Sequence, residues 1–485
     1  MLSMYLNRPL HTSWLVMFAC FALVGGIVGA RFLPIGMFSS LAWLLAGIAA
    51  IISAFVYQKM WFISFAVIGG GLIGLWRGTT QSANLAVYDQ LYLRHVTISG
   101  SISDDIDINK RAQMVLRLNN VDVRGHHLTG KMWVTLRTHH LLERSDRVTL
   151  EGKVTEGFGT FAASVYDAKL IKVHPPTQPD VALRVRNWFA GGVKLATNEP
   201  QTSLGLGYLL GQRRGLPEAL SAALIATGLT HVVVASGYNL TILVRLARRL
   251  FEKISKYLSF LASSLMILGF IAVTGMSPSM ARAGLVAGLS LITWYYGRHI
   301  HPFVLLAIAM AITLFINPSY AWGDLGWQLS FAAFAGVMIV APIMNAYFFG
   351  DAKEKTLRRI LIETLSAQVC TLPIILYAFG QMSVIAPIAN IMILPLVPLA
   401  MLGTFIAGIG GLALPMAAQV IGLPAEIVLS YMTQTIEYMG KLPWAVQQFT
   451  VSSVGVLAMY SIIIIVTLWM WHKTKLDLRA TSLIE

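Results

Sequence analysis

The sequence predicts a polytopic α-helical membrane protein with an inserted small all-β domain of the OB type. Hydrophobic residues make up 56% of the 485 residues and charged residues only 12%, about half the charged share of a soluble domain. The apolar residues come in runs of about 20, the length with which a helix crosses the hydrocarbon core. Because lipid offers the backbone no hydrogen bonds, such runs must be helical.

Three membrane helices are expected in the N-terminal segment 1–80, with spans near 14–30, 40–56 and 62–76. The segment 90–176 is different, since charge rises and apolar residues alternate with polar ones at strand period. Alternation predicts strands at 95–102, 114–121, 131–137, 147–154 and 161–173. Five short strands fit a small Greek-key barrel of the OB type. From Arg94 to Asp180 the chain has 12 basic and 10 acidic residues, so net charge alone does not predict nucleic-acid binding by this domain.

A basic and apolar segment, 181–197, predicts an amphipathic helix at the membrane interface. The remainder, 202–472, is expected to form a second membrane domain, followed by a short cytoplasmic tail at 473–485. Its spans are predicted near 230–244, 258–274, 282–296, 302–316, 326–344, 360–379, 384–408, 418–439 and 452–471. Glycine and proline interrupt 202–229, which indicates re-entrant or half helices, although glycine is also common at plain helix contacts.

Loop charge predicts the orientation. Alternating the spans places the basic clusters at 245–256, 298, 353–359 and 473–479 on one side, and the positive-inside bias makes that side cytoplasmic. We therefore expect a multi-pass protein of the inner (plasma) membrane with both termini in the cytoplasm. The β domain is then extracytoplasmic.

Four ordered motifs lie between Gly205 and Pro398. They are Gly228-Leu-Thr-His231 with Ser236-Gly237-Tyr-Asn239; Gly275 with Pro278 and Arg282-Ala; Asn317-Pro318 with Gln328-Leu-Ser330-Phe331; and Gly380-Gln381 with Asn390, Pro395 and Pro398. In these motifs the sequence resembles the ComEC competence family. The three leading spans and the β insertion are also similar to that family's N-terminal part.

The resemblance implies an inner-membrane channel for uptake of single-stranded DNA during natural transformation, and not an enzyme. It also implies membrane lipids as surroundings, an extracytoplasmic DNA receptor and a cytoplasmic helicase or ATPase motor as partners. Two departures matter. The family's second histidine is Asn239 here, which loses proton exchange and most metal affinity. The metallo-β-lactamase-like domain of some members is not expected in this chain, so another protein would degrade the second strand.

Arginines are the first candidate site residues. Arg282 lies one turn inside a predicted helix, where it either reaches the interface or contacts a phosphate at the pore mouth. Arg213 and Arg214 lie in the broken segment and either draw DNA phosphates or anchor a loop.

Polar residues inside apolar runs form the second group, because buried amides and hydroxyls either bond another helix or line water. The candidates for the channel are His231, Ser236, Gly237, Asn239, Gln328, Ser330, Gln368 and Asn390. Helix breaks are expected at Pro278, Pro373, Pro387, Pro395 and Pro398, and Asp324 is expected to cap a helix.

Other functions remain open. A transporter of another anionic solute or lipid precursor would use the same broken helices, and an assembly scaffold is a third possibility. An intramembrane hydrolase would use Ser236 with His231, but five residues of helix place them about 140° apart and no nucleophile elbow is present. No P-loop sequence occurs, and neither a metal nor a cofactor is expected.

Overall fold

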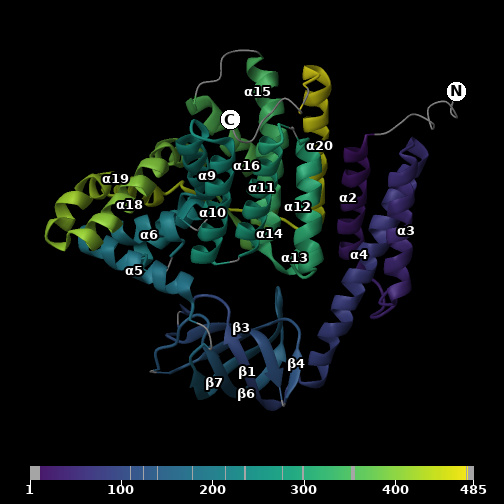
Figure 1. Cartoon of the computed structure of the whole chain (residues 1–485), viewed down its shortest axis with the longest axis horizontal. Coiled ribbons are helices and arrows are strands. Elements are labelled where there is room, and N and C mark those ends of the chain that lie inside the picture. The colour runs from purple at the N-terminus through teal and green to yellow at the C-terminus, as the bar shows by residue number, and fades with distance from the viewer. Residues whose placement is uncertain are drawn as a thin grey trace. The chain divides into compact units, whose positions relative to one another are not determined.

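The computed structural model describes residues 11–109, 111–123, 125–138, 140–176, 179–212, 215–233, 236–275, 277–297, 300–350, 356–476 and 478. Contacts divide the chain into two compact units, Met1–Leu183 with Ala307–Trp327, and Arg184–Leu306 with Gln328–Glu485. The first unit contains the N-terminal helices and the β domain, and the second contains most of the remaining helices (Figure 1).

Glycines bring the N-terminal helices together. The helices are α2 (Thr12–Ala30), α3 (Leu41–Tyr57) and α4 (Ile63–Leu85). A Cβ added at Gly70 or Gly74 of α4 would collide with the α2 backbone at Ala19 or Leu23. Small residues at four-residue spacing let membrane helices approach closely, so packing replaces the hydrophobic effect that lipid does not supply.

Arg77 of α4 closes the end of a helix from far along the chain. Its Nε donates to Phe315 O (2.7 Å) and its Nη2 to Ile316 O (3.0 Å), the last carbonyls of α12 (Pro302–Ile316). A helix C-terminus leaves its last carbonyls unpaired and carries partial negative charge. The arginine therefore pairs two of these carbonyls and places a positive charge at the negative end of the helix. The short helix α13 (Tyr320–Gly323) follows α12 in the chain.

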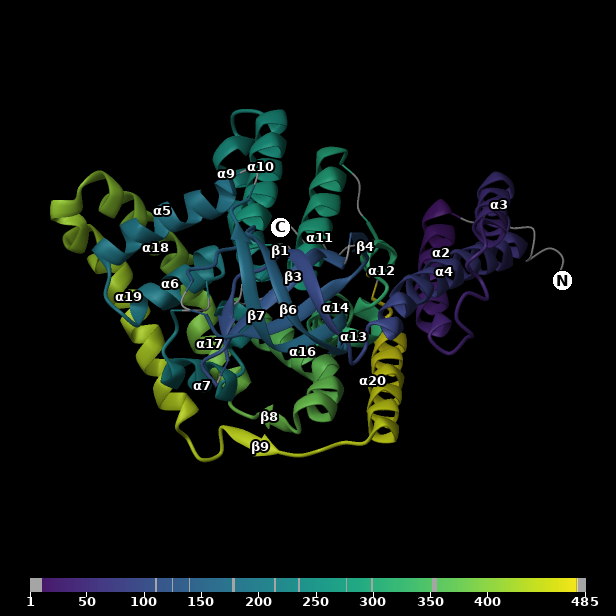
Figure 2. The ribbon, with the colours of Figure 1, turned by 90° about the horizontal axis from the view of Figure 1, so that it is seen from below.

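Five strands close into a barrel, which Figure 2 shows from below. They are β1 (His95–Ile102), β3 (Met114–Val123), β5 (Lys131–Leu136), β6 (Arg147–Glu156) and β7 (Phe161–His174). Strand β1 pairs with β3 and β6, and β3 also pairs with β5. Strand β7 pairs with β5 in parallel and with β6 antiparallel. This closure confirms the predicted OB-like barrel.

Alternating apolar residues explain why the predicted strands begin where the observed ones do. Ile98, Leu116, Val134 and Leu150 all point into the barrel and are at most 1% exposed. The register of β1 against β3 shifts around Gly100, where the strand bends to join both neighbours. The short strands β2 (Asp107–Ile108) and β4 (His126–Leu128) were not predicted, because two or three residues show no period.

The second unit is helical, with one small two-stranded sheet. After α5 (Val181–Ala196), its elements are α6 (Gln201–Leu210), α7 (Glu218–Ala226), α8 (Thr230–Val233), α9 (Gly237–Glu252), α10 (Lys256–Thr274), α11 (Pro278–Tyr295), α14 (Leu325–Ala335), the π-helix η3 (Gly336–Val340), α15 (Ala341–Phe349), α16 (Thr356–Phe379), β8 (Gln381–Ser383), α17 (Ala386–Ile393), η4 (Leu394–Leu396), α18 (Val397–Ala413), η5 (Pro415–Ala417), α19 (Ala418–Gly440), β9 (Val446–Gln448) and α20 (Ser453–Thr474).

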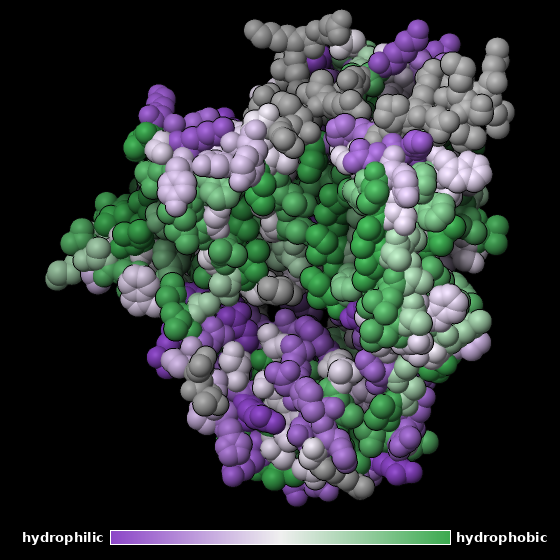
Figure 3. Space-filling view, turned by 45° about the vertical axis from the view of Figure 1, so that its right-hand side comes forward, coloured by the Kyte–Doolittle hydropathy of each residue, from purple (hydrophilic) through white to green (hydrophobic). Residues whose placement is uncertain are grey.

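The chain is a polytopic membrane protein. Eight helical segments of the described residues are long and apolar enough to cross a membrane: Thr12–Ala30, Met60–Gln90, Lys256–Thr274, Leu325–Phe349, Thr356–Phe379, Ala386–Ala413, Pro415–Gly440 and Ser453–Thr474. Apolar side chains cover the helices in the space-filling view, whereas hydrophilic ones gather on the β domain (Figure 3).

Three expectations about helices need correction or refinement. The predicted span 230–244 is not one helix, because α8 ends at Val233 and Ser236 caps a new, amphipathic helix α9. Pro373 does not break α16, which continues to Phe379. Pro387, Pro395 and Pro398 lie in the first turns of α17, η4 and α18, and these segments follow one another without a loop from Ala386 to Ala413.

Candidate functional site

The start of α9 is fixed by a serine cap. The Ser236 hydroxyl accepts a hydrogen bond from the backbone N–H of Asn239 (3.4 Å). A Cβ at Gly237 would lie 3.3 Å from both Ala283 Cβ and Arg282 Nη2. The glycine thus lets α11 and its arginine come close to the first turn of α9.

Asn239 joins three helices from a fully buried position. Its Nδ2 donates to Tyr208 O and to Val232 O, both at 3.0 Å, and the residue is 0% exposed. It therefore ties α9 to α6 and α8, where short helices leave carbonyls without a helical partner. Two donated bonds need an amide, and a carboxylate could not supply them.

Arg282 is the cation around which three motifs meet. Its Nε donates to Ser330 Oγ (2.6 Å), and its guanidinium lies 5.9 Å from the Phe331 ring and 5.3 Å from the Phe334 ring. No carboxylate lies within ion-pair distance of it among the described residues. Pro278 begins α11 as its first residue, as predicted, and Ser277 caps it. The contacts that the charge makes are thus with two aromatic faces and one neutral hydroxyl.

His231 and Ser236 are engaged in separate local hydrogen bonds. The His231 Nδ1 lies 2.9 Å from Gly228 O, and the Ser236 oxygen serves the α9 cap. No hydrogen bond joins the two side chains in the described part of the chain. The geometry thus gives no support to the hydrolase hypothesis.

The fourth motif packs against the first. Gln368 Nε2 donates to Ser383 O (2.9 Å), and Ser383 Oγ donates to Ala226 O (2.7 Å). Gly228 has a φ of +69°, and a Cβ there would lie 3.0 Å from Ala386 Cβ. Tyr238, at the start of α9, donates to Leu394 O beside the proline breaks (3.2 Å).

The remaining predicted residues are placed less centrally. Asn390 is 4% exposed, and its Oδ1 accepts no hydrogen bond from the described residues. Gln328 lies on α14, two residues before Ser330. Asp324 caps this helix as predicted, since its Oδ1 accepts from Trp327 N (2.6 Å). Arg213 and Arg214 lie outside the described residues.

An aromatic and basic cluster on the barrel was not predicted. Trp133 of β5 lies 5.3 Å from Phe158 and 5.2 Å from Phe161, and the Arg117 guanidinium lies 5.5 Å from the Trp133 ring. Lys131, also on β5, pairs with Asp104 at 3.3 Å. We name Arg117, Lys131, Trp133, Phe158 and Phe161 the barrel cluster. The sequence signal that could have been noticed is Phe158, a large aromatic residue between Gly157 and Gly159. In the structure its side chain is 46% exposed.

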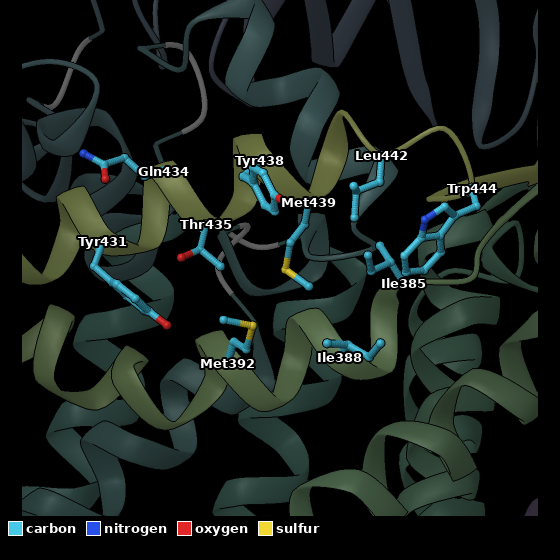
Figure 4. A pocket seen from close by; sticks show the side chains of 10 residues that line it. All are labelled: Ile385, Ile388, Met392, Tyr431, Gln434, Thr435, Tyr438, Met439, Leu442 and Trp444. Atoms are coloured by element: carbon cyan, nitrogen blue, oxygen red, sulfur yellow. The ribbon is translucent and has the colours of Figure 1, made fainter.

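A cavity of about 480 Å³ opens between α17 and α19 and has a different chemistry (Figure 4). Its lining is mainly apolar and aromatic and includes Ile388, Met392, Tyr438 and Trp444. None of its lining residues carries a formal charge, so it offers no counter-charge to a polyanion.

The fold and the site define a multi-pass membrane protein with an OB-like barrel and an arginine site built from dispersed motifs. The model of the family described as "Competence protein" matches residues 208–474, more than half of the chain. The chain therefore belongs to the competence protein family. All the motif residues that the structure brings together lie within the match.

A curated relative supports the ComEC type. The chain is 27% identical over 220 residues to the ComE operon protein 3 of Bacillus subtilis (strain 168). The aligned segment covers 43% of this chain. The matched segment spans 27% of that relative's length. No solved structure matches the chain.

Proposed function

We propose that the chain is the inner-membrane channel through which single-stranded DNA is taken up during natural transformation. The observation that supports this most is Arg282, held by Ser330 beside the first turn of α9 with no carboxylate partner among the described residues. A helix N-terminus and a guanidinium both favour anions. A DNA strand carries one phosphate for each nucleotide, so it presents such a site with repeated ligands.

The contacts of Arg282 suggest how a phosphate would be accepted. The hydroxyl of Ser330 is a weak, neutral acceptor, and a phosphate oxygen is a stronger, charged one. The Phe331 and Phe334 rings keep the guanidinium in place while its hydrogen-bond partner changes. On this proposal Arg282 contacts the passing strand, and Ser330 positions the arginine between contacts.

The barrel would guide the strand before it enters the membrane. In OB folds the second and third strands and the loop between the last two strands bind oligonucleotides. The barrel cluster occupies these elements, since Arg117 lies on β3, Lys131 and Trp133 on β5, and Phe158 between β6 and β7. We further propose that the barrel is extracytoplasmic, that a DNA receptor delivers the strand there, and that a cytoplasmic helicase or ATPase motor pulls it.

Deletion of the gene tests the function. Without the channel, transformation by external DNA should be abolished, and the unaltered gene in trans should restore it. Normal transformation in the deletion strain would end the proposal.

Complementation with Arg282→Ala tests the site. Loss of one charge-assisted contact of roughly 1.5–3 kcal/mol should lower transformation about tenfold or more, while membrane abundance stays unchanged. Arg282→Lys should retain part of the activity, because the charge remains but the bidentate geometry is lost. Equal transformation by Ala, Lys and the unaltered protein would remove the phosphate role.

Flux of a labelled oligonucleotide into vesicles holding the purified protein separates this function from its rivals. A transporter of a small anion or lipid precursor would pass its own solute and exclude the strand. A scaffold would pass neither.

A further inference from the structure

The turn between β6 and β7, residues 157–160, contacts α13 backbone to backbone. Gly159 has a φ of +60°, and a Cβ added there would lie 2.9 Å from Gly323 O. A Cβ added at Gly323, the last residue of α13, would collide with the Gly159 carbonyl and lie 2.8 Å from Thr160 N. Both segments belong to the first unit of the chain. Two glycines therefore let the barrel touch a helix at a distance that any side chain would prevent.

Helix α13 is in turn fastened to α2. Trp322 Nε1 donates to Val28 O (3.2 Å), one of the carbonyls that the C-terminus of α2 leaves without a helical partner. The Trp322 ring lies 5.4 Å from the Phe32 ring in an edge arrangement, and the Arg31 guanidinium lies 5.3 Å from the Trp322 ring. The helix that receives the barrel turn is thus held by a hydrogen bond and by ring contacts.

The barrel has a second attachment, to the end of α4. The 3-10 helix η2 (Ala86–Gln90) continues α4, and its Tyr88 is 0% exposed in the apolar core of the barrel. Leu85, the last residue of α4, packs against the same core. A body attached at one point can turn about that point, whereas a second attachment fixes its orientation. The glycine contact at α13 therefore restricts how the barrel can turn about the end of α4.

The docked turn carries the exposed ring of the barrel cluster. Phe158 immediately precedes Gly159 and is 46% exposed. Beyond Gly323 the chain continues into α14, the helix whose Ser330 accepts a hydrogen bond from Arg282. The glycine contact thus joins the segment that exposes the stacking ring to the segment that leads into the helix positioning the arginine.

We propose that Gly159 and Gly323 are positioning residues, whose contact holds the Phe158 turn at α13 so that a strand stacked on the barrel is presented to the membrane helices. The inference rests on the proposed function, and it adds two residues that the four motifs do not name. Neither glycine has a side chain with which to bind a base or a phosphate. The contact sets where a bound strand is held and not how tightly, so its loss lowers transport and leaves affinity unchanged.

Gly323→Ala tests the contact, and Gly29→Ala is its matched control. Both add one methyl group to a helical glycine of the first unit, but a Cβ at Gly29 would meet no atom of the described residues within 4 Å. The full-length proteins are compared in uncharged lipid. Anisotropy of a labelled oligothymidylate gives the dissociation constant, and its flux into vesicles gives transport.

Gly323→Ala should bind the oligonucleotide as the unaltered protein does but pass it about tenfold more slowly, since overpacking lowers the docked population. Gly29→Ala should change neither quantity. Equal transport by the two variants would overturn the inference. A loss of affinity as large as the loss of transport would also overturn it, because the contact would then act on binding.

Trp322→Ala loosens the same contact without adding an atom to it. The change removes the hydrogen bond to Val28 and the ring contacts that fasten α13, and Trp322 is 41% exposed, so the folded core is spared. Trp43→Ala on α3 is the control, because Trp43 is 39% exposed and packs on the Phe38 ring at 4.9 Å. Trp322→Ala should lower transport and keep affinity, and Trp43→Ala should change neither. Normal transport by both tryptophan variants would mean that α13 does not position the turn.

Combining Gly323→Ala with Phe158→Ala separates positioning from a general loss of stability. At saturating oligonucleotide both changes remove presentation of the strand, so the double variant should pass it no more slowly than the slower single variant. Losses that multiply would show that the two residues act independently, which contradicts the inference. If the unaltered protein passes no strand, the proposed function itself fails. If it and Gly323→Ala pass the strand equally, only the positioning by α13 fails.

Discussion

Asp180 shows how a single residue can link the barrel to the helix that follows it. Its carboxylate accepts from Arg144 Nε (2.9 Å) and Nη2 (3.1 Å), from Ser145 Oγ (2.9 Å) and from the backbone N–H of Leu183 (2.9 Å). The last bond caps α5. Burial raises the pKa of Asp180, but the hydrogen bonds from Arg144, Leu183 and Ser145 outweigh it and leave the pKa below its ordinary value.

The depressed pKa predicts a pH-dependent cap. A carboxyl with a lower folded-state pKa stabilises at pH values above its unfolded pKa of about 3.9 and loses this effect as pH falls through the folded value. At pH 7 the Leu183 amide should therefore exchange faster in Asp180→Asn than in the unaltered protein. The free energy of protection of this amide should fall by roughly 1.5–3 kcal/mol.

The difference should close below about pH 3.9. Arg144→Gln should show the same loss at pH 7, because it removes the other half of the pair. A difference that persists unchanged into acid would contradict the ionic explanation.

Helix α4 shows, at the scale of an element, that adjacent glycines can have different surroundings. Gly70 and Gly74 face α2, whereas a Cβ at Gly71 would meet no atom within 4 Å. Three glycines on one helix thus differ only in what lies opposite. Sequence shows the row, and the structure shows which members touch a partner.

Gly74→Leu should separate α2 from α4. Overpacking costs roughly 1–3 kcal/mol, so the melting temperature of the detergent-solubilised protein should fall. Gly71→Leu is the control, because it makes the same change in helix propensity on an open face. Equal melting temperatures for the two variants would show that the close contact contributes no stability.

At the scale of the whole molecule, the proposed function requires two steps, because a strand would have to be met before the membrane and conducted within it. On this proposal, the barrel cluster and the Arg282 site would serve these steps with different chemistries. Aromatic rings stack on bases of any sequence, and arginines contact phosphates. The Arg117 and Lys131 cations are already paired with Asp107 and Asp104, so stacking should supply more of the barrel's affinity.

Phe158→Ala should weaken single-strand binding by the full-length protein about 5- to 150-fold, the equivalent of roughly 1–3 kcal/mol for one stacked base. Tyr166→Ala is the matched control, since Tyr166 is an exposed aromatic of β7 outside the cluster. The two dissociation constants can be compared by anisotropy. Equal values would remove the barrel cluster from the DNA path.

Local pattern determined much of the fold. The five barrel strands begin at the residues where alternation begins. Pro387, Pro395 and Pro398 lie in the first turns of α17, η4 and α18, where the missing N–H of proline is tolerated. The span 230–244 was wrong because composition does not show the cap at Ser236, which restarts the helix with a charged face. Asn239 was predicted as a polar channel candidate, and the structure adds that it donates to two backbone carbonyls.

By itself the sequence determined the membrane character, the barrel and the identity of the motif residues, because these depend on composition and on periods of a few residues. Only the tertiary structure decided that Arg282 meets Gly237 and Ser330. The physical reason is distance along the chain. The three residues lie on different helices, and each is 45 or more positions from the next along the chain, so only packing determines that they meet.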